Sequence, residues 1–212
     1  MKEVFNFIRT IGKLKGKQRR GWVLHKIKNS ETTAEHIFHV AFLAWVGGKL
    51  ENLNSEKLIK MALLHDLCEI LAPDFTSYDA KGLKRKEKIS LKEALKIVPK
   101  KGRPALWQRK KLERIKRKLE DRAMKKILKK LPEKIKKEME LLWQEYREQI
   151  TPEAKLVKQS DRMINLLQGL EYWKKYGRIE KELWIQRAKE VIDNPFLINF
   201  LKYLEKTFEK RN

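Results

Sequence analysis

The apolar residues of this 212-residue chain recur almost everywhere with the three- to four-residue spacing of amphipathic helices. The nine glycines and six prolines fall mostly between these periodic segments, where such residues end or begin helices. No segment alternates apolar and polar residues over a useful length, and no internal repeat is visible. The sequence therefore predicts an all-α fold, and its length suits a single domain over residues 1–212.

The boundaries of the expected helices follow from capping residues, glycines and prolines. Thr32 and Glu35 form the pattern of a capping box, and Gly47-Gly48 marks the far end of the helix that it opens. Pro73 ends the next helix, and residues 72–83 are expected to be a loop, as is the segment "KGKQRRGW". The other expected helices cover residues 2–14, 55–71, 84–97, 105–130, 132–148 and 151–172, with two more separated at Asn194-Pro195.

The composition narrows the class of protein. No apolar run is long enough to span a bilayer, and the amphipathic N-terminus lacks the uninterrupted apolar stretch of a signal peptide. The single cysteine, Cys68, excludes an internal disulfide and a multi-cysteine zinc site, and it is expected to be a small core residue. A cytoplasmic protein is expected, and the heavy use of Lys, Arg and Glu is typical of thermophiles.

Positive charge is concentrated in one segment. The chain carries a formal net charge of +23, and residues 81–130 alone contain 22 Lys or Arg against 5 Asp or Glu. We interpret this segment as a basic helical elaboration within the single domain. A nucleic-acid surface is the alternative, but no aromatic or glycine pattern of a known nucleic-acid module accompanies the charge, so a solvated or subunit-packing elaboration is favoured.

Polar residues interrupt an otherwise apolar helical stretch at "LLHDLCEILAPD". Helical spacing places His65, Asp66 and Glu69 on the face that the apolar residues indicate is buried. A buried carboxylate needs a partner, and a metal ion is a good one, although a hydrogen-bonded structural cluster is the alternative. Asp161 and His36 likewise lie beside apolar stripes on other helices.

Two imidazoles and two carboxylates suit a divalent transition metal with open positions for water and substrate. The candidate ligands are His36, His65, Asp66 and Asp161. The residue types do not select among Co, Mn, Ni, Zn, Fe and Mg. Only His25 and His39 remain as further histidines, which favours one metal ion over two. His25 is expected to be solvated, and His39 to be a packed or surface residue.

Four blocks, "RRGWV", "ETTAEH", "HDLCEILAPD" and "AKLVKQSD", occur in an order that resembles the HD-domain metal-dependent phosphohydrolases. The likeness is to the branch that contains the bacterial 5'-deoxynucleotidases and their eukaryotic and archaeal relatives, and it covers most of residues 5–205. It implies an HD-domain helical bundle, usually a homodimer, that hydrolyses deoxyribonucleoside 5'-monophosphates. Hydrolysis of nucleoside triphosphates by another HD phosphohydrolase, or polyanion binding through residues 81–130, are the alternatives.

The resemblance also assigns roles to residues. It implies that His36, His65, Asp66 and Asp161 hold one divalent metal ion, and that Glu69 and Asp74 are catalytic. The loop with Phe75, Thr76 and Ser77 would lie against the nucleoside. An Arg-Trp element would bind phosphate and sugar, but Gly21 directly precedes Trp22 here, so Arg19 or Arg20 would have to reach instead. Trp22 could also be only a packing aromatic.

Overall fold

The computed structural model describes residues 1–84, 93, 96–100 and 102–210, and within these ranges it contains helices and no strand. The all-α prediction is confirmed. A single antiparallel bridge joins Gln18 to Thr32 and ties the segment before α2 to the start of α3. Most of the helix predicted over residues 84–97 lies outside the described residues.

The described α-helices and short 3-10 helices (η) follow the chain closely. They are α1 (Lys2–Ile11), η1 (Gly12–Gly16), α2 (Arg20–Leu24), α3 (Thr33–Leu50), α4 (Ser55–Leu64), η2 (Leu67–Ile70), α5 (Ser77–Gly82), α7 (Leu106–Leu128), α8 (Glu133–Glu148), α9 (Pro152–Tyr176), α10 (Lys181–Lys189) and α11 (Pro195–Thr207). No described helix is long and apolar enough to cross a membrane.

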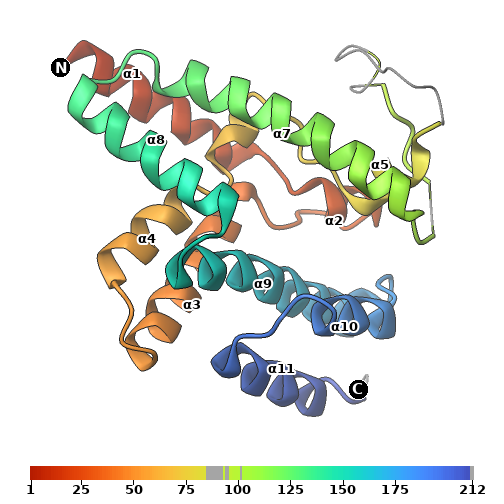
Figure 1. The fold of residues 1–212 in the computed structure, drawn as a ribbon. Helices are drawn as coiled ribbons and strands as arrows, with labels where there is room; N and C mark the ends of the chain where they lie inside the picture. Colours follow the sequence, from red (N-terminus) through yellow and green to blue (C-terminus); the bar gives the residue numbers. More distant parts are fainter. Residues whose placement is uncertain (85–92, 94–95, 101, 211–212) are drawn as a thin grey trace.

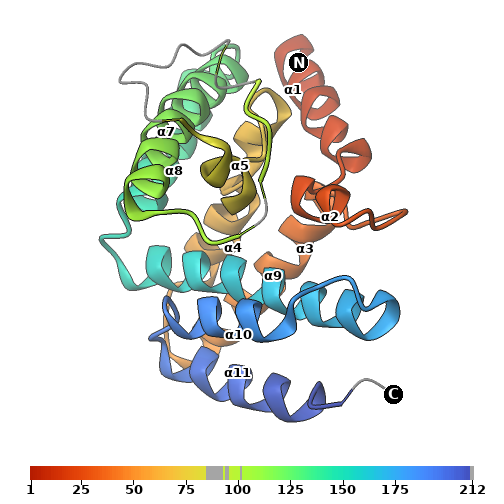
Figure 2. The same cartoon turned by 90° about the vertical axis from the view of Figure 1, so that its right-hand side faces the viewer.

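Helices α3, α4 and α9 pack together at the centre of the molecule. Both views show α9, α10 and α11 stacked on one another, with α1, α7 and α8 on the opposite side of α3 and α4 (Figures 1 and 2). Helix α9 carries eleven buried residues, more than any other described helix. Its Thr151 cap and first-turn Pro152 fix its start, and the apolar stripe that follows carries Asp161 into the interior.

Helix α3 begins as predicted and ends later than predicted. The Thr32–Glu35 capping box is present, but the helix continues through Gly47 and Gly48 to Leu50. The two glycines are needed for close packing and do not end the helix. A Cβ on Gly48 would lie 2.0 Å from Leu58 Cδ1, and one on Gly47 would lie 2.8 Å from the Phe196 ring.

The predicted helix over residues 55–71 is interrupted in its middle. Helix α4 ends at Leu64, a turn contains His65 and Asp66, and η2 follows. Asp66 has φ −113° and ψ 12°, outside the helical range. Successive side chains of a continuous helix point about 100° apart. The turn removes that constraint, so both side chains face the same site.

Two predicted loops contain short helices. Helix α2 lies in the segment "KGKQRRGW", and α5 lies within residues 72–83. A capping box between Thr76 and Asp79 starts α5, a signal that the loop prediction overlooked. The predictions for α8, α10 and α11 are confirmed, and α9 extends four residues beyond the predicted Tyr172.

Candidate metal centre and nucleotide pocket

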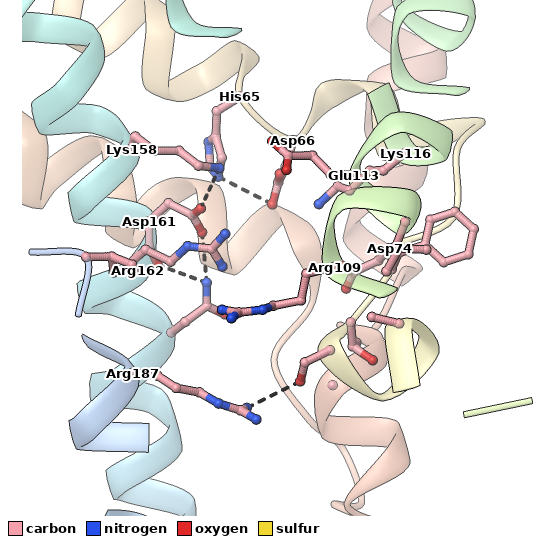
Figure 3. A pocket seen from close by; sticks show the side chains of 18 of the residues that line it. His65, Asp66, Asp74, Arg109, Glu113, Lys116, Lys158, Asp161, Arg162 and Arg187 are labelled. Carbon is pink, nitrogen blue, oxygen red and sulfur yellow. Dashed lines mark hydrogen bonds and ion pairs between the residues drawn. The ribbon is translucent and has the colours of Figure 1, made fainter. Parts of the chain in front are cut away.

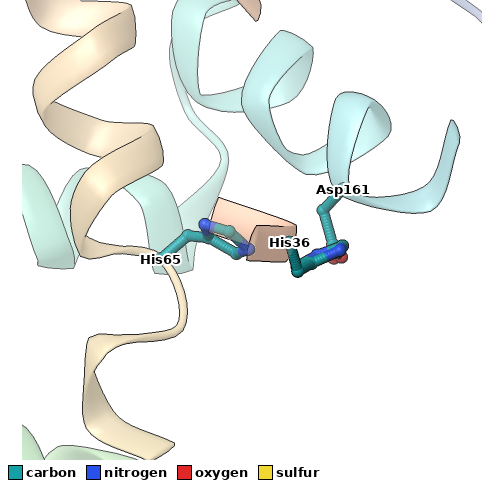
Figure 4. A group of neighbouring side chains, drawn as sticks. All are labelled: His36, His65 and Asp161. Atoms are coloured by element: carbon teal, nitrogen blue, oxygen red, sulfur yellow. Dashed lines mark hydrogen bonds and ion pairs between the residues drawn. The ribbon is translucent and has the colours of Figure 1, made fainter. Parts of the chain in front are cut away.

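Three side chains from three helical elements converge at the buried centre. His36 from α3, His65 from the end of α4 and Asp161 from α9 each offer an atom, and these atoms lie within 4.8 Å of one another (Figure 4). His36 Nε2 lies 3.1 Å from Asp161 Oδ1. Asp66 Oδ2 lies 3.3 Å from His65 Nε2 and 3.9 Å from His36 Nε2. All four predicted ligands therefore meet at one point.

The two imidazoles are oriented by groups behind them. His65 Nδ1 donates to the carbonyl of Ala62 at 2.6 Å, which leaves the lone pair on Nε2. That Nε2 is buried and makes no hydrogen bond with any described residue. His36 Nδ1 faces the buried carboxylate of Glu31 at 3.6 Å. A carbonyl or carboxylate behind a histidine, with the other ring nitrogen directed inward, is typical of metal-binding histidines.

The centre favours positive charge. Burial and the charge of Arg19 lower the pKa of His36, but bonds to Asp161 and Glu31 outweigh them and raise it to about 9. Burial raises the pKa of the Asp161 carboxyl, yet Lys158 and His36 bring it well below its ordinary value. The pKa of Asp66 is likewise lowered, because His65 and Arg19 outweigh burial. These carboxylates are therefore ionised and suited to a cation.

Arg19 is held by the acidic residues of the site. Its Nη1 lies 2.6 Å from Asp66 Oδ2, 3.0 Å from Glu69 Oε1 and 3.8 Å from Asp74 Oδ2. Burial alone would lower the pKa of Arg19, but these carboxylates raise it well above its ordinary value. Arg20 instead pairs with Asp79 at 2.7 Å. Of the two predicted arginines, only Arg19 lines the pocket and lies in the centre.

Glu69 is almost fully buried at the inner end of the pocket. It accepts hydrogen bonds from Arg19 at 3.0 Å and from the Thr33 hydroxyl at 3.1 Å. Burial, with the nearby charges of Asp66 and Asp74, raises the pKa of the Glu69 carboxyl well above its ordinary value. A carboxyl with a raised pKa is suited to exchanging a proton near neutral pH.

The loop after Pro73 forms part of the pocket wall, as predicted. Asp74 is buried and accepts a hydrogen bond from the Arg20 backbone N–H at 3.0 Å. Phe75, Thr76 and Ser77 follow it along the wall. Phe75 packs in a small apolar cluster, and Ser77 Oγ accepts from Arg187 at 3.3 Å.

Trp22 lines the pocket with only a 1 % exposed surface. Its ring stacks on Trp184 at 5.1 Å and meets Tyr172 edge-on at 5.2 Å. Its Nε1 donates to Glu31 Oε2 at 3.0 Å. Trp22 thus orients Glu31, which in turn faces His36, and this packing agrees with the alternative that the sequence left open.

The pocket itself has a volume of about 590 Å³ and extends from the centre between α7 on one side and α9 and α10 on the other (Figure 3). Sequence analysis did not predict the basic side chains on these walls. They are Arg109, Lys116 and Arg117 from α7, Lys158 and Arg162 from α9, and Arg187 from α10. Arg162 and Lys158 could have been found from their spacing to Asp161. No signal distinguished Arg109 or Lys116 from the many other cations of residues 81–130.

The remaining predictions on single residues have mixed outcomes. His39 is exposed and Cys68 is fully buried, as expected, and burial raises the pKa of the Cys68 thiol. The expectation that His25 is solvated is wrong. Its ring is half-buried, lies 2.9 Å from the Tyr78 hydroxyl and 3.0 Å from the Arg178 carbonyl, and links α2 to α5 and to the turn after α9.

Comparison with known families agrees with this geometry. The sequence profile described as "HD domain" matches residues 11–113 and 104–198, which together include most of the chain. The chain belongs to the HD-domain family. The match includes both histidines and both aspartates of the centre.

HD-domain relatives with assigned names are spread widely. The chain is 31% identical to 5'-deoxynucleotidase HDDC2 of Homo sapiens over 171 residues, covering 81% of this chain and 69% of that protein. It is 31% identical to 5'-deoxynucleotidase HDDC2 of Dictyostelium discoideum over 193 residues, covering 88% and 86%.

Solved structures share the fold. A predicted metal-dependent phosphohydrolase from Magnetospirillum magnetotacticum superposes with a TM-score of 0.63 at 22% identity, covering 99% of this chain and 95% of that one. A conserved hypothetical protein from Pyrococcus furiosus gives 0.65 at 23% identity, covering 95% and 99%.

Proposed function

We propose that this protein hydrolyses deoxyribonucleoside 5'-monophosphates to deoxynucleoside and phosphate with one bound divalent metal ion. The observation that carries the proposal is the convergence of His36, His65, Asp66 and Asp161 at the inner end of a pocket in an HD-domain chain. The relatives named 5'-deoxynucleotidase support this choice of substrate.

The donor set fits a metal ion. The unpartnered, buried Nε2 of His65 supports this fit, because a buried polar atom without a partner costs free energy. His36, His65, Asp66 and Asp161 would hold the ion. Once bound, it would lower the pKa of a bound water and polarise a phosphoryl oxygen. Imidazole and carboxylate ligands are compatible with Mn, Fe, Co, Ni or Zn, and the choice among them stays open.

The surrounding residues would position the reacting groups. Glu69, fixed by Arg19 and Thr33, would orient the attacking water and accept its proton. Asp74 would hold the sugar or donate a proton to the leaving 5' oxygen, and residues 75–77 would lie along the nucleoside. Arg19 balances the carboxylates, so its main role would be to keep Asp66 and Glu69 in place.

We also propose that the protein is a homodimer. Helix α3 exposes a stripe of aromatic side chains, Phe38, Phe42 and Trp45, which are 58 %, 49 % and 40 % exposed. The spacing of four and then three residues puts them on one helix face. A contiguous exposed apolar patch on a charged protein is typical of a subunit interface. Sedimentation of wild type and a Phe42→Glu variant would test this: a dimer that becomes a monomer supports it, and a monomeric wild type contradicts it.

The decisive experiment is phosphate release from a panel of deoxyribo- and ribonucleoside 5'-monophosphates. Metal-stripped protein would be assayed after addition of Mn, Co, Ni, Zn or Mg, beside an Asp66→Ala variant. We expect metal-dependent release from the deoxyribonucleotides and none from the variant. Release from nucleoside triphosphates alone would identify another HD phosphohydrolase activity, and no release with any metal or substrate would overturn the proposal.

A further inference from the structure

Three arginines that line the pocket make no ion pair with any described residue. They are Arg109 from α7, Arg162 from α9 and Arg187 from α10. Arg109 and Arg162 project from opposite walls into the space between α7 and α9, and Arg187 lies farther from His65 and Asp66 (Figure 3). The one printed partner of Arg187 is the neutral hydroxyl of Ser77. Converging guanidinium groups repel one another unless an anion lies between them.

Other cations already serve the phosphate that would be hydrolysed. Lys158 Nζ lies 3.3 Å from Asp161 Oδ2, and Lys116 points from α7 toward Asp66 (Figure 3). Burial lowers the pKa of Lys116, but Glu120 and Asp66 outweigh it and keep the ammonium charged. With a divalent ion, these two lysines would surround a phosphate bound at the ligands. The three arginines therefore exceed what one phosphate group requires.

Charge over the whole pocket agrees with this surplus. Among the described lining residues, nine are Lys or Arg and seven are Asp or Glu. Several of the acidic residues are already paired: Asp66, Glu69 and Asp74 with Arg19, and Glu120 with Arg147. A bound divalent ion would add further positive charge to the same pocket. A substrate with one phosphate dianion would leave positive charge without a counter-ion.

We propose that Arg109, Arg162 and Arg187 form a second anion subsite, which binds a further phosphate group on the nucleotide. The inference rests on the proposed function, because it takes the first phosphate to be bound at the metal ligands. Guanidinium groups bind phosphate oxygens in bidentate fashion, so this subsite selects nucleotides with a second phosphate over simple monophosphates. The second phosphate is attached either at the 5' end, as in a diphosphate, or at the 3' position, as in a bisphosphate.

The test is titration calorimetry of the full chain, as purified, with three ligands. These are deoxyadenosine 5'-monophosphate, deoxyadenosine 5'-diphosphate and deoxyadenosine 3',5'-bisphosphate. We expect at least one of the two doubly phosphorylated ligands to bind about tenfold more tightly than the monophosphate, the size of one charge-assisted contact. The tighter of the two identifies where the second phosphate is attached.

Two variants and two matched controls localise the effect. Arg109→Gln and Arg187→Gln should each reduce the preference for the doubly phosphorylated ligand severalfold. Lys110→Gln on α7 and Lys189→Gln on α10 remove a neighbouring exposed charge that does not line the pocket, and should leave the preference unchanged.

Two results would overturn the subsite: equal binding of all three ligands, or an equal loss of affinity for all three in the arginine variants. The second result would assign the arginines to the single phosphate. If the ligand preference is found but no phosphate is released from any monophosphate, the subsite stands and the proposed reaction fails.

Discussion

Helices α9 and α7 form facing walls of the same pocket, yet they contribute in opposite ways. Helix α9 is largely buried and positions Asp161 through apolar packing on every side. Helix α7 is mostly exposed, and only one of its faces enters the pocket, with Arg109, Lys116 and Arg117. The comparison teaches that a metal ligand requires a rigid, dry support, whereas substrate-binding cations can come from a solvated helix.

The strongest test of this contrast exchanges one carboxylate on each wall for its amide. Asp161→Asn should abolish metal binding and lower phosphate release by several kcal/mol of activation free energy, on the order of a thousandfold. Glu113→Gln on α7 lines the same pocket and should leave metal content unchanged. Metal analysis and phosphate release would measure both. Loss of the metal in the Glu113 variant would show that the α7 wall also holds the ion.

A smaller effect is expected behind the metal ligands. Glu31→Gln weakens the support of His36 and removes an acceptor charge from Trp22, so metal affinity should fall about 10- to 100-fold. Glu35→Gln is the matched control, because Glu35 stabilises the start of the same helix from the surface. It should alter stability by about 1 kcal/mol and leave metal affinity unchanged. Equal metal affinity in both variants would contradict the role of Glu31.

The packing of the two walls should differ in stability. Leu170→Ala in α9 removes a fully buried side chain from the main core and should lower the free energy of unfolding by about 2–5 kcal/mol. Leu112→Ala in α7 affects only the small cluster with Phe75, Ala80 and Leu83, so its cost should lie at or below the low end. Urea denaturation would compare them. A larger loss for Leu112 would mean that α7 is the more important support.

The smallest effects are expected on the outer face of α7. Lys110, Arg114 and Lys118 are exposed at four-residue spacing, and each change to Gln should alter stability by less than about 0.5 kcal/mol. Binding of single-stranded DNA, measured at two salt concentrations, would test whether this face has another role. Tight binding that weakens steeply with salt, and that the triple variant loses, would support the nucleic-acid alternative.

The sequence by itself determined the helical class and which residues could be buried. Helical spacing correctly placed His36, His65 and Asp161 among buried residues, because an amphipathic stripe must face the core wherever the helix packs. The Thr32 and Thr151 caps likewise fixed helix starts from local hydrogen bonds alone. Local chemistry of this kind needs no information about the rest of the chain.

Tertiary structure decided which residues meet. Gly47 and Gly48 stay helical because neighbouring side chains need the space of a missing Cβ, which no local pattern reveals. The break at Asp66 allows adjacent residues to face one centre, and the ion pairs of Arg19 join residues 47 to 55 positions apart. The pocket cations of α7 were indistinguishable from their exposed neighbours in sequence, because charge alone does not tell which face of a polar helix is covered.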